Sequence, residues 1–275
     1  MSTRKPLPFD LLGNTRLLQP ALSMHKGIPI LKLLILSCFL LAGCHAPRVV
    51  TVDSKESPLN VETSRAKQTA QQFENTNYLL YLPEDYGQEG HRWPLILYLH
   101  GKSLRGSDLE QLKSYGLAAL LEKDLRIPFV VVSPQCPGDR TWLTEDETLN
   151  RLIDHVVSTY AVDPERVYVT GHSMGGRGTW LLAYKHPEKL AAIVPMSDAP
   201  LDDAWAKQVA KVPAWVFHGT KDDLEPFERT RQFAEALKKY RAEVKFTPLP
   251  DRDHYILDIY ENQEIYDWLL QHKRK

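Results

Sequence analysis

The sequence contains little cysteine and no excess of charge of either sign. The first argues against a disulfide-rich protein, and the second against a nucleic-acid-binding one. Three cysteines occur among 275 residues, so a fold held together by several disulfides is excluded. Lys and Arg number 34 against 35 Asp and Glu. With no basic surplus to neutralise phosphates, we expect no nucleic-acid partner. No metal-ligand cluster or glycine-rich dinucleotide motif is visible, so we expect no metal and no other cofactor.

Long apolar runs are also scarce, and the strongest one lies near the N-terminus. Residues 33–42 form an apolar run of about 10 residues, which suits the core of a signal peptide and is too short to span a bilayer. Leu41-Ala42-Gly43-Cys44 follows and resembles the bacterial lipoprotein box. We therefore predict that residues 1–43 are a signal region, with translation starting at Met24, and that Cys44 is lipidated. An uncleaved anchor or an ordinary export signal is the alternative.

The segment after Cys44 is polar and poor in large apolar residues. We interpret residues 44–72 as the lipidated N-terminus and a tether, and residues 73–275 as the catalytic domain. His45 stands where lipoproteins of the inner membrane commonly carry aspartate. By that analogy we predict an exported bacterial lipoprotein, attached to a membrane by its lipid and held in the outer membrane facing the periplasm.

Beyond residue 76, apolar strand patterns alternate with helical patterns. Residues 127–133 (IPFVVVS) are almost continuously apolar, as in a strand buried on both faces of a parallel sheet. A capping-box pattern from Thr144 to Glu147 precedes an apolar helical face. The alternation predicts an α/β fold with a mostly parallel central sheet and helices on both faces. Strands are expected at 78–82, 94–99, 127–133, 166–170, 190–195, 214–218 and 244–247, and helices at 149–160, 174–186, 226–240 and 261–271.

A candidate nucleophile lies between a predicted strand and a predicted helix. Gly171-His172-Ser173-Met174-Gly175 has the form G-x-S-x-G and directly follows the strand pattern RVYVT. This motif places a serine on a sharp strand-to-helix turn, where glycines keep other side chains away from it. We therefore predict that Ser173 is a nucleophile. A glycine-rich turn with an incidental serine is the alternative.

A serine nucleophile needs a base, and the base needs an acid to orient it. With a nucleophile turn of this kind, the chain order is Ser, then Asp or Glu, then His. His254 follows the last predicted strand and is the predicted base. Asp222 follows the strand at 214–218 and is the favoured acid, with Asp223 and Asp198 as alternatives.

Two backbone groups are candidates for stabilising an oxyanion. The N–H of the residue after the nucleophile, Met174, is one. The loop after the strand at 94–99 supplies the other, and there Gly101 allows a close approach of the backbone and the N–H of Lys102 is the candidate donor. Alternatively, Gly101 only ends the strand.

Several motifs in order resemble one branch of the α/β-hydrolases. They are LILYLHGKSLRGSD, SPQCPGDRTW, DPERVYVTGHSMGGRGTW and VFHGTKDDLEPFERT, and the resemblance covers about residues 76–272. They are similar to bacterial carboxylesterases, phospholipases and predicted peptidases near the dienelactone-hydrolase and prolyl-oligopeptidase-like families. The resemblance implies an α/β-hydrolase fold and selects Asp222 as the acid. The chain departs from the family pattern at Lys102-Ser103, at Glu225 and at Asp253.

The predicted function is hydrolysis of small carboxylic esters through an acyl-enzyme. Too few residues separate the strands at 190–195 and 214–218 for a large lid, which favours an open cleft. A serine peptidase acting on short peptides with the same triad is the alternative. A non-catalytic binding lipoprotein stays a third hypothesis, because fold alone does not fix function, but the intact triad argues against it.

Overall fold

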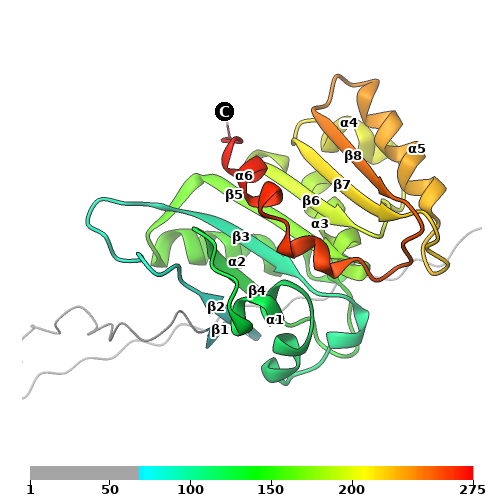
Figure 1. The fold of residues 1–275 in the computed structure, drawn as a ribbon. Coiled ribbons are helices and arrows are strands. Elements are labelled where there is room, and N and C mark those ends of the chain that lie inside the picture. Colours follow the sequence, from blue (N-terminus) through cyan, green and yellow to red (C-terminus); the bar gives the residue numbers. More distant parts are fainter. Residues whose placement is uncertain (1–67, 275) are drawn as a thin grey trace, which may run out of the picture. The chain divides into compact units, whose positions relative to one another are not determined.

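The computed structural model describes residues 68–274, whose strands form one eight-stranded sheet (Figure 1). The predicted signal region 1–43, the predicted lipidation site Cys44 and the tether as far as residue 67 lie outside the described residues. The first strand, β1, spans Thr69–Phe73. The sheet therefore begins within the last residues that were assigned to the tether.

The sheet is mostly parallel, as predicted. Its strand order is β1-β2-β4-β3-β5-β6-β7-β8. The pairs β1–β2 and β2–β4 are antiparallel, and all other neighbours are parallel. The remaining strands are β2 Thr76–Tyr81, β3 Trp93–Leu99, β4 Val130–Pro134, β5 Val162–His172, β6 Ala192–Met196, β7 Ala214–Gly219 and β8 Val244–Leu249.

Helices cover both faces of this sheet, which confirms the predicted layer arrangement (Figure 1). Alternate residues of β3 point to opposite faces, so Leu95 and Leu97 join one core while Ile96 and Tyr98 join the other. The first core contains α2 Asp146–Thr159, α3 Met174–Lys185, α4 Ala206–Val209 and α5 Phe227–Lys238; the second contains α1 Gly116–Lys123 and α6 Gln263–Leu270.

Some local predictions were wrong. Helix α1 was not predicted. The capping box does not form, because Thr144 ends a 3-10 helix and its hydroxyl donates to the carbonyl of Thr141, 2.9 Å away. Helix α2 instead begins at Asp146 after Glu145, which makes no side-chain capping bond. The strand predicted from residue 127 begins at Val130.

The connection between β6 and β7 confirms the absence of a large lid. It contains only a 3-10 turn, Asp203–Trp205, and the four-residue helix α4. Among residues 68–274, no helix is both long enough and apolar enough to cross a membrane.

Candidate active site

Ser173 lies on a strained turn between β5 and α3. Its φ of 56° and ψ of −122° are unusual for a residue with a side chain. A Cβ at Gly175 would lie 1.8 Å from the carbonyl oxygen of Leu99, and one at Gly171 would lie 2.5 Å from the Gly175 backbone. Both glycines are therefore required by close backbone packing. The Ser173 N–H donates to the Met196 carbonyl over 2.9 Å, which ties the turn to β6.

The structure brings Ser173, His254 and Asp222 together. Nε2 of His254 lies 2.8 Å from Oγ of Ser173, and Nδ1 of His254 lies 2.8 Å from Oδ2 of Asp222. Because an ionised carboxylate only accepts hydrogen bonds, Nδ1 of His254 carries the hydrogen that it donates to Asp222. Nε2 is then free to accept the serine hydroxyl.

The Asp222 carboxylate is held by several donors. Its side chain is fully buried, and its Oδ1 accepts the N–H groups of Leu224 and Glu225, each over 2.9 Å. Burial alone would raise the pKa of Asp222, but the Glu225 N–H and the His254 ring outweigh it and lower the pKa. The acid therefore stays ionised at neutral pH.

The two alternative acids lie in other surroundings. Asp223 is exposed, while Asp198 is buried and pairs with Arg177 rather than with His254. Burial raises the pKa of Asp198 to about 8. Of the three candidates, the structure thus places only Asp222 against the predicted base.

His218 is a neighbour of the acid whose position sequence reasoning missed. Its Nε2 lies 3.0 Å from Oδ2 of Asp222, and its Nδ1 lies 2.8 Å from the hydroxyl of Thr230. Burial lowers the pKa of His218, so the ring is neutral with its hydrogen on Nε2. The available signal was its place at the end of β7, four residues before Asp222.

His172 supports the backbone of the base. Its Nε2 lies 2.7 Å from the carbonyl oxygen of His254, which also accepts the Ser197 hydroxyl over 3.0 Å. Burial lowers the pKa of His172 to about 4. The neutral ring therefore donates from Nε2 and fixes the segment that carries His254.

The two candidate oxyanion donors begin helical segments beside Ser173. Met174 begins α3, and Lys102 begins a 3-10 helix, Lys102–Leu104. Neither N–H has a backbone acceptor among residues 68–274, as expected for the first residue of a helix. A Cβ at Gly101 would lie 3.9 Å from Cβ of Ser173, so the loop that carries Lys102 borders Ser173.

His100 orients the peptide between Gly101 and Lys102. Nε2 of His100 accepts the Cys136 N–H over 3.0 Å, and Nδ1 lies 2.7 Å from the Gly101 carbonyl oxygen. Burial lowers the pKa of His100 to about 4, so the neutral ring carries its hydrogen on Nδ1. Because C=O and N–H point in opposite directions across a trans peptide, this bond directs the Lys102 N–H away from His100.

A cavity of about 490 Å³ opens over Ser173 and His254. Lys102 and Arg105 supply cationic side chains to it, while Leu224 and Tyr255 supply apolar surface that is more than half exposed. A larger cavity of about 960 Å³ is lined by residues such as Glu165, Lys211 and Arg274 and contains no member of the triad. We therefore take the smaller cavity, which Ser173 and His254 line, as the candidate active site.

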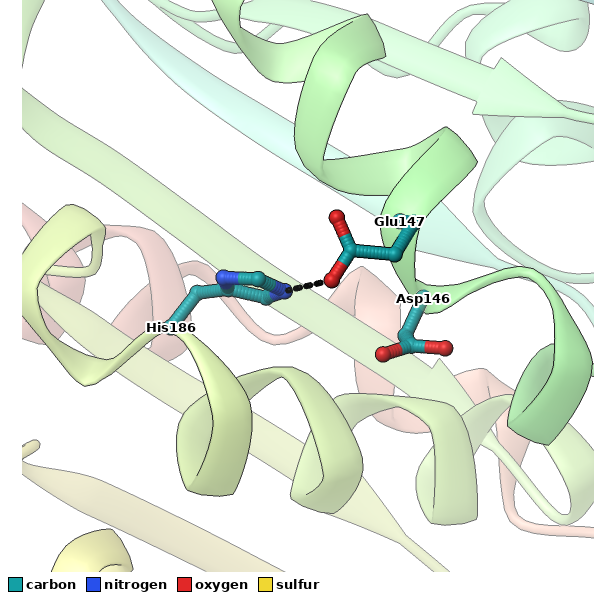
Figure 2. A group of neighbouring side chains, drawn as sticks. All are labelled: Asp146, Glu147 and His186. Atoms are coloured by element: carbon teal, nitrogen blue, oxygen red, sulfur yellow. Dashed lines mark ion pairs between the residues drawn. The ribbon is translucent and has the colours of Figure 1, made fainter.

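One group among the described residues has the spacing of metal ligands. Figure 2 shows Asp146, Glu147 and His186, whose candidate ligand atoms lie within 4.8 Å of one another. The two acids stand in the first turn of α2, where the helix dipole favours negative charge, and the Glu147 side chain is 68% exposed. None of the three lines the cavity over Ser173, so we assign them no role at the active site.

Comparisons with known proteins agree with this geometry. Residues 134–263 match the dienelactone hydrolase family. Over 188 residues, the chain is 30% identical to the bifunctional acetylxylan esterase/xylanase XynS20E of Neocallimastix patriciarum, covering 64% of this chain and 26% of that protein. It is also 35% identical over 80 residues to cutinase 1 of Thermobifida cellulosilytica, covering 28% of this chain and 29% of the cutinase. The chain thus spans less than a third of the length of each of these relatives.

Solved structures show the same fold. A thermostable esterase superposes with a TM-score of 0.65 at 26% identity, covering 76% of this chain and 64% of the esterase. The acylaminoacyl peptidase of Pyrococcus horikoshii superposes with a TM-score of 0.59 at 15% identity, covering 77% of this chain and 42% of the peptidase. The fold is therefore that of the α/β-hydrolases, as the sequence predicted.

Proposed function

We propose that this α/β-hydrolase, which carries a dienelactone hydrolase family domain at residues 134–263, cleaves carboxylic esters through an acyl-enzyme formed on Ser173. One observation carries the proposal. Ser173, His254 and Asp222 form a continuous chain with two hydrogen bonds of 2.8 Å, which is the arrangement that activates a serine hydroxyl.

Each residue of the site has a defined part in this reaction. His254 accepts the Ser173 proton as Oγ attacks the ester carbonyl, and the backbone N–H groups of Met174 and Lys102 stabilise the resulting oxyanion. His254 then donates the proton to the departing alcohol. In the second half, His254 deprotonates water, which attacks the acyl group, and then returns that proton to Oγ of Ser173 as the bond to the acyl group breaks and the acid is released. Asp222 holds the ring of His254 in the required tautomer throughout.

The comparisons favour esters over amides as substrates. An esterase is the structural relative with the higher identity, at 26%, whereas the acylaminoacyl peptidase, at 15%, shares the fold alone. The cavity of about 490 Å³ falls in the range of small-molecule sites. We therefore propose small-molecule esters as substrates, with short peptides as the alternative.

Labelling with a fluorophosphonate, read by mass spectrometry, tests the nucleophile. We expect a single adduct on Ser173 and none in Ser173→Ala. Ser103→Ala is the matched control, because Ser103 lines the same cavity and its loss leaves the adduct intact. Turnover of an aryl ester beside the matching anilide then separates esterase from peptidase activity. A folded protein without an adduct would instead support the non-catalytic binding hypothesis.

We further propose that the protein is exported and anchored in the outer membrane, facing the periplasm, by a lipid on Cys44. The small residues before this cysteine support the proposal. Metabolic incorporation of an alkyne fatty acid is expected in the native chain and not in Cys44→Ala. Fractionation of the labelled membranes tests the location, and label in the inner membrane would contradict it.

A further inference from the structure

Arg177 bridges two acids that lie on different loops. It stands in the first turn of α3, four residues after Ser173. Its Nε donates to Oδ1 of Asp198 over 3.1 Å, and its Nη2 donates to Oε1 of Glu225 over 3.0 Å. Asp198 follows β6, and Glu225 belongs to the loop after β7 that carries Asp222. A single guanidinium therefore connects the helix of the nucleophile to the loop of the acid.

The backbone of Glu225 links this ion pair to Asp222. Its N–H donates to Oδ1 of Asp222 over 2.9 Å. Its carbonyl oxygen lies 3.2 Å from Nε2 of His218, the nitrogen that also contacts Oδ2 of Asp222. The position of Glu225 thus sets donors on both oxygens of the Asp222 carboxylate.

Hydrogen bonds close this arrangement into a ring. The carbonyl of Asp198 accepts the hydroxyl of Thr230 over 3.1 Å, and the same hydroxyl lies 2.8 Å from Nδ1 of His218. With the His218 hydrogen on Nε2, both Nδ1 and the Asp198 carbonyl are acceptors, so the Thr230 hydroxyl donates to one or the other. The ring of contacts therefore runs through Arg177, Asp198, Thr230, His218 and Glu225. Two of these residues, His218 and Glu225, contact the carboxylate of Asp222.

Two members of this ring, Asp198 and Arg177, are largely shielded from water. The Asp198 side chain is 1% exposed and the Arg177 side chain 28% exposed, and Oδ2 of Asp198 has no partner among the described residues. Burial raises the pKa of Asp198 to about 8, so its carboxyl is largely protonated at neutral pH, and without Arg177 its buried Oδ1 would keep only the Ala199 N–H as a donor. Loss of Arg177 would also remove its hydrogen bond to Glu225, and with it the ion pair between α3 and the loop that carries Asp222.

We propose that Arg177 and Glu225 are positioning residues of this hydrolase, whose ion pair holds the acid loop, residues 222–225, against the helix that follows Ser173. The proposal rests on the proposed function. Held in this way, Asp222 keeps its hydrogen bond to Nδ1 of His254 when that ring becomes positively charged during turnover. Neither residue exchanges a proton with the substrate.

Arg177 is a better residue to substitute than Glu225, because it does not line the cavity over Ser173. Arg177 lines a small neighbouring pocket of about 170 Å³ but not the cavity over Ser173, whereas Glu225 lines both. A change at Arg177 therefore leaves the direct contacts with substrate intact. The positioning role predicts a loss in kcat with little change in KM.

The experiment compares four full-length proteins on one aryl ester. Arg177→Met removes both hydrogen bonds and keeps an unbranched side chain, Arg177→Lys keeps the charge, and Arg151→Met removes the exposed Arg151–Glu74 pair as a matched control. We expect kcat to fall about ten-fold in Arg177→Met with KM within about two-fold, since small displacements of reacting groups are enough for such losses. Arg177→Lys is expected to recover part of the loss, and Arg151→Met to match the native protein.

A spectroscopic measurement separates positioning from general stability. The proton on Nδ1 of His254 is expected to give a low-field ¹H NMR signal in the native protein and in Arg151→Met. In Arg177→Met this signal should broaden or move upfield. Glu225→Gln, which lacks the partner charge, should change it in the same way, and the double variant should be no worse than Arg177→Met alone. Glu225→Gln also carries the test if Arg177→Met does not fold.

Specific outcomes would overturn the proposal. It is wrong if Arg177→Met loses no more kcat than Arg151→Met, if only KM changes, or if the low-field signal persists unchanged while the melting temperature falls. Failure of the proposed function is distinguishable. In that case the native protein shows neither ester turnover nor a Ser173 adduct, while the NMR comparison still tests whether Arg177 positions Asp222.

Discussion

Among the glycines of the described residues, Gly175 is the one where an added Cβ would come closest to another atom. Any side chain there meets the Leu99 backbone, with a Cβ only 1.8 Å from its carbonyl oxygen. Backbone atoms of a central strand cannot move aside as the end of a flexible side chain can. The glycine of the nucleophile motif therefore serves packing as well as access to Ser173.

Gly175→Ala is accordingly expected to destabilise the protein by about 3 kcal/mol or more, the upper part of the range for overpacked cores. Gly138→Ala is the control, because a Cβ there meets nothing within 4 Å, and it should change stability by less than about 1 kcal/mol. Chemical denaturation measures both. Equal effects of the two changes would show that Leu99 can move.

Cys136 is expected to be unreactive in the folded protein. The residue is fully buried, and burial raises the pKa of its thiol to about 12. Since the thiolate is the reactive form, iodoacetamide at pH 8 should leave the Cys136 peptide unmodified in the native state and modify it completely in denaturant. Modification of the native protein at the rate of the denatured one would contradict this.

The residues of the predicted triad could be chosen from the sequence because the motif and the chain order restrict them. Ser173 has a local signature, and His254 follows from its place after the last strand. The acid stayed open among Asp222, Asp223 and Asp198, since all three follow strands of the same sheet. The partners of His218 and Arg177 could not be predicted, because their contacts depend on how β7 and α3 lie beside distant loops.

At the scale of an element, the 3-10 helix Lys102–Leu104 offers a direct test of a backbone donor. Gly101 before it is extended, with φ −74° and ψ 171°, which is the conformation preferred before proline. Proline is also accepted at the first position of a helix. Lys102→Pro can therefore keep the local fold while it removes the N–H proposed to stabilise the oxyanion.

We expect Lys102→Pro to lower kcat about 100- to 1,000-fold, as losing one oxyanion donor does in other enzymes. Lys102→Ala keeps the N–H and should stay within about three-fold of the native kcat. Steady-state kinetics on a neutral aryl ester measures both changes, with circular dichroism to verify folding. A loss of the same size in Lys102→Ala would assign the effect to the ammonium group instead.

Elements with a clear apolar period were predicted better than those without one. The strands of the parallel sheet and helices α2, α3, α5 and α6 follow from apolar periodicity. Helix α1 is as long as α6, eight residues, but it begins GLAALL, which is apolar without interruption, so no helical period is visible in it. The predicted capping box was wrong because Thr144 is the last residue of a 3-10 helix, and Glu145 rather than Thr144 precedes the first residue of α2.

At the scale of the whole described domain, buried histidines make stability depend on pH. Burial lowers the pKa of His100 and His172 from 6.5 to about 4 and also lowers that of His218. Below pH 6.5 the unfolded chain binds protons that the folded chain does not, so the free energy of unfolding falls as pH falls toward 4. Asp198 acts in the opposite sense, because its pKa is raised to about 8. It reduces the free energy of unfolding as pH rises from about 4 to about 8.

The balance of these groups predicts maximal stability between about pH 6 and 7. Between pH 6.5 and 4, three histidines lower the free energy of unfolding on acidification and one acid, Asp198, raises it. The net free energy of unfolding therefore falls as the pH falls. His100 and His172 each contribute about 3 kcal/mol to that fall, at 1.36 kcal/mol for each unit of pKa change. Above pH 6.5 Asp198 is the one group of these four that still titrates, and the free energy of unfolding should fall again as the pH rises.

Urea unfolding from pH 4.5 to 8.5 measures the dependence of this free energy on pH. His172→Gln should reduce the slope of the acid limb by about one proton, whereas His91→Gln, at an exposed position, should leave it unchanged. An acid limb that is equally steep in both variants would mean that the buried rings are not the groups that take up the protons.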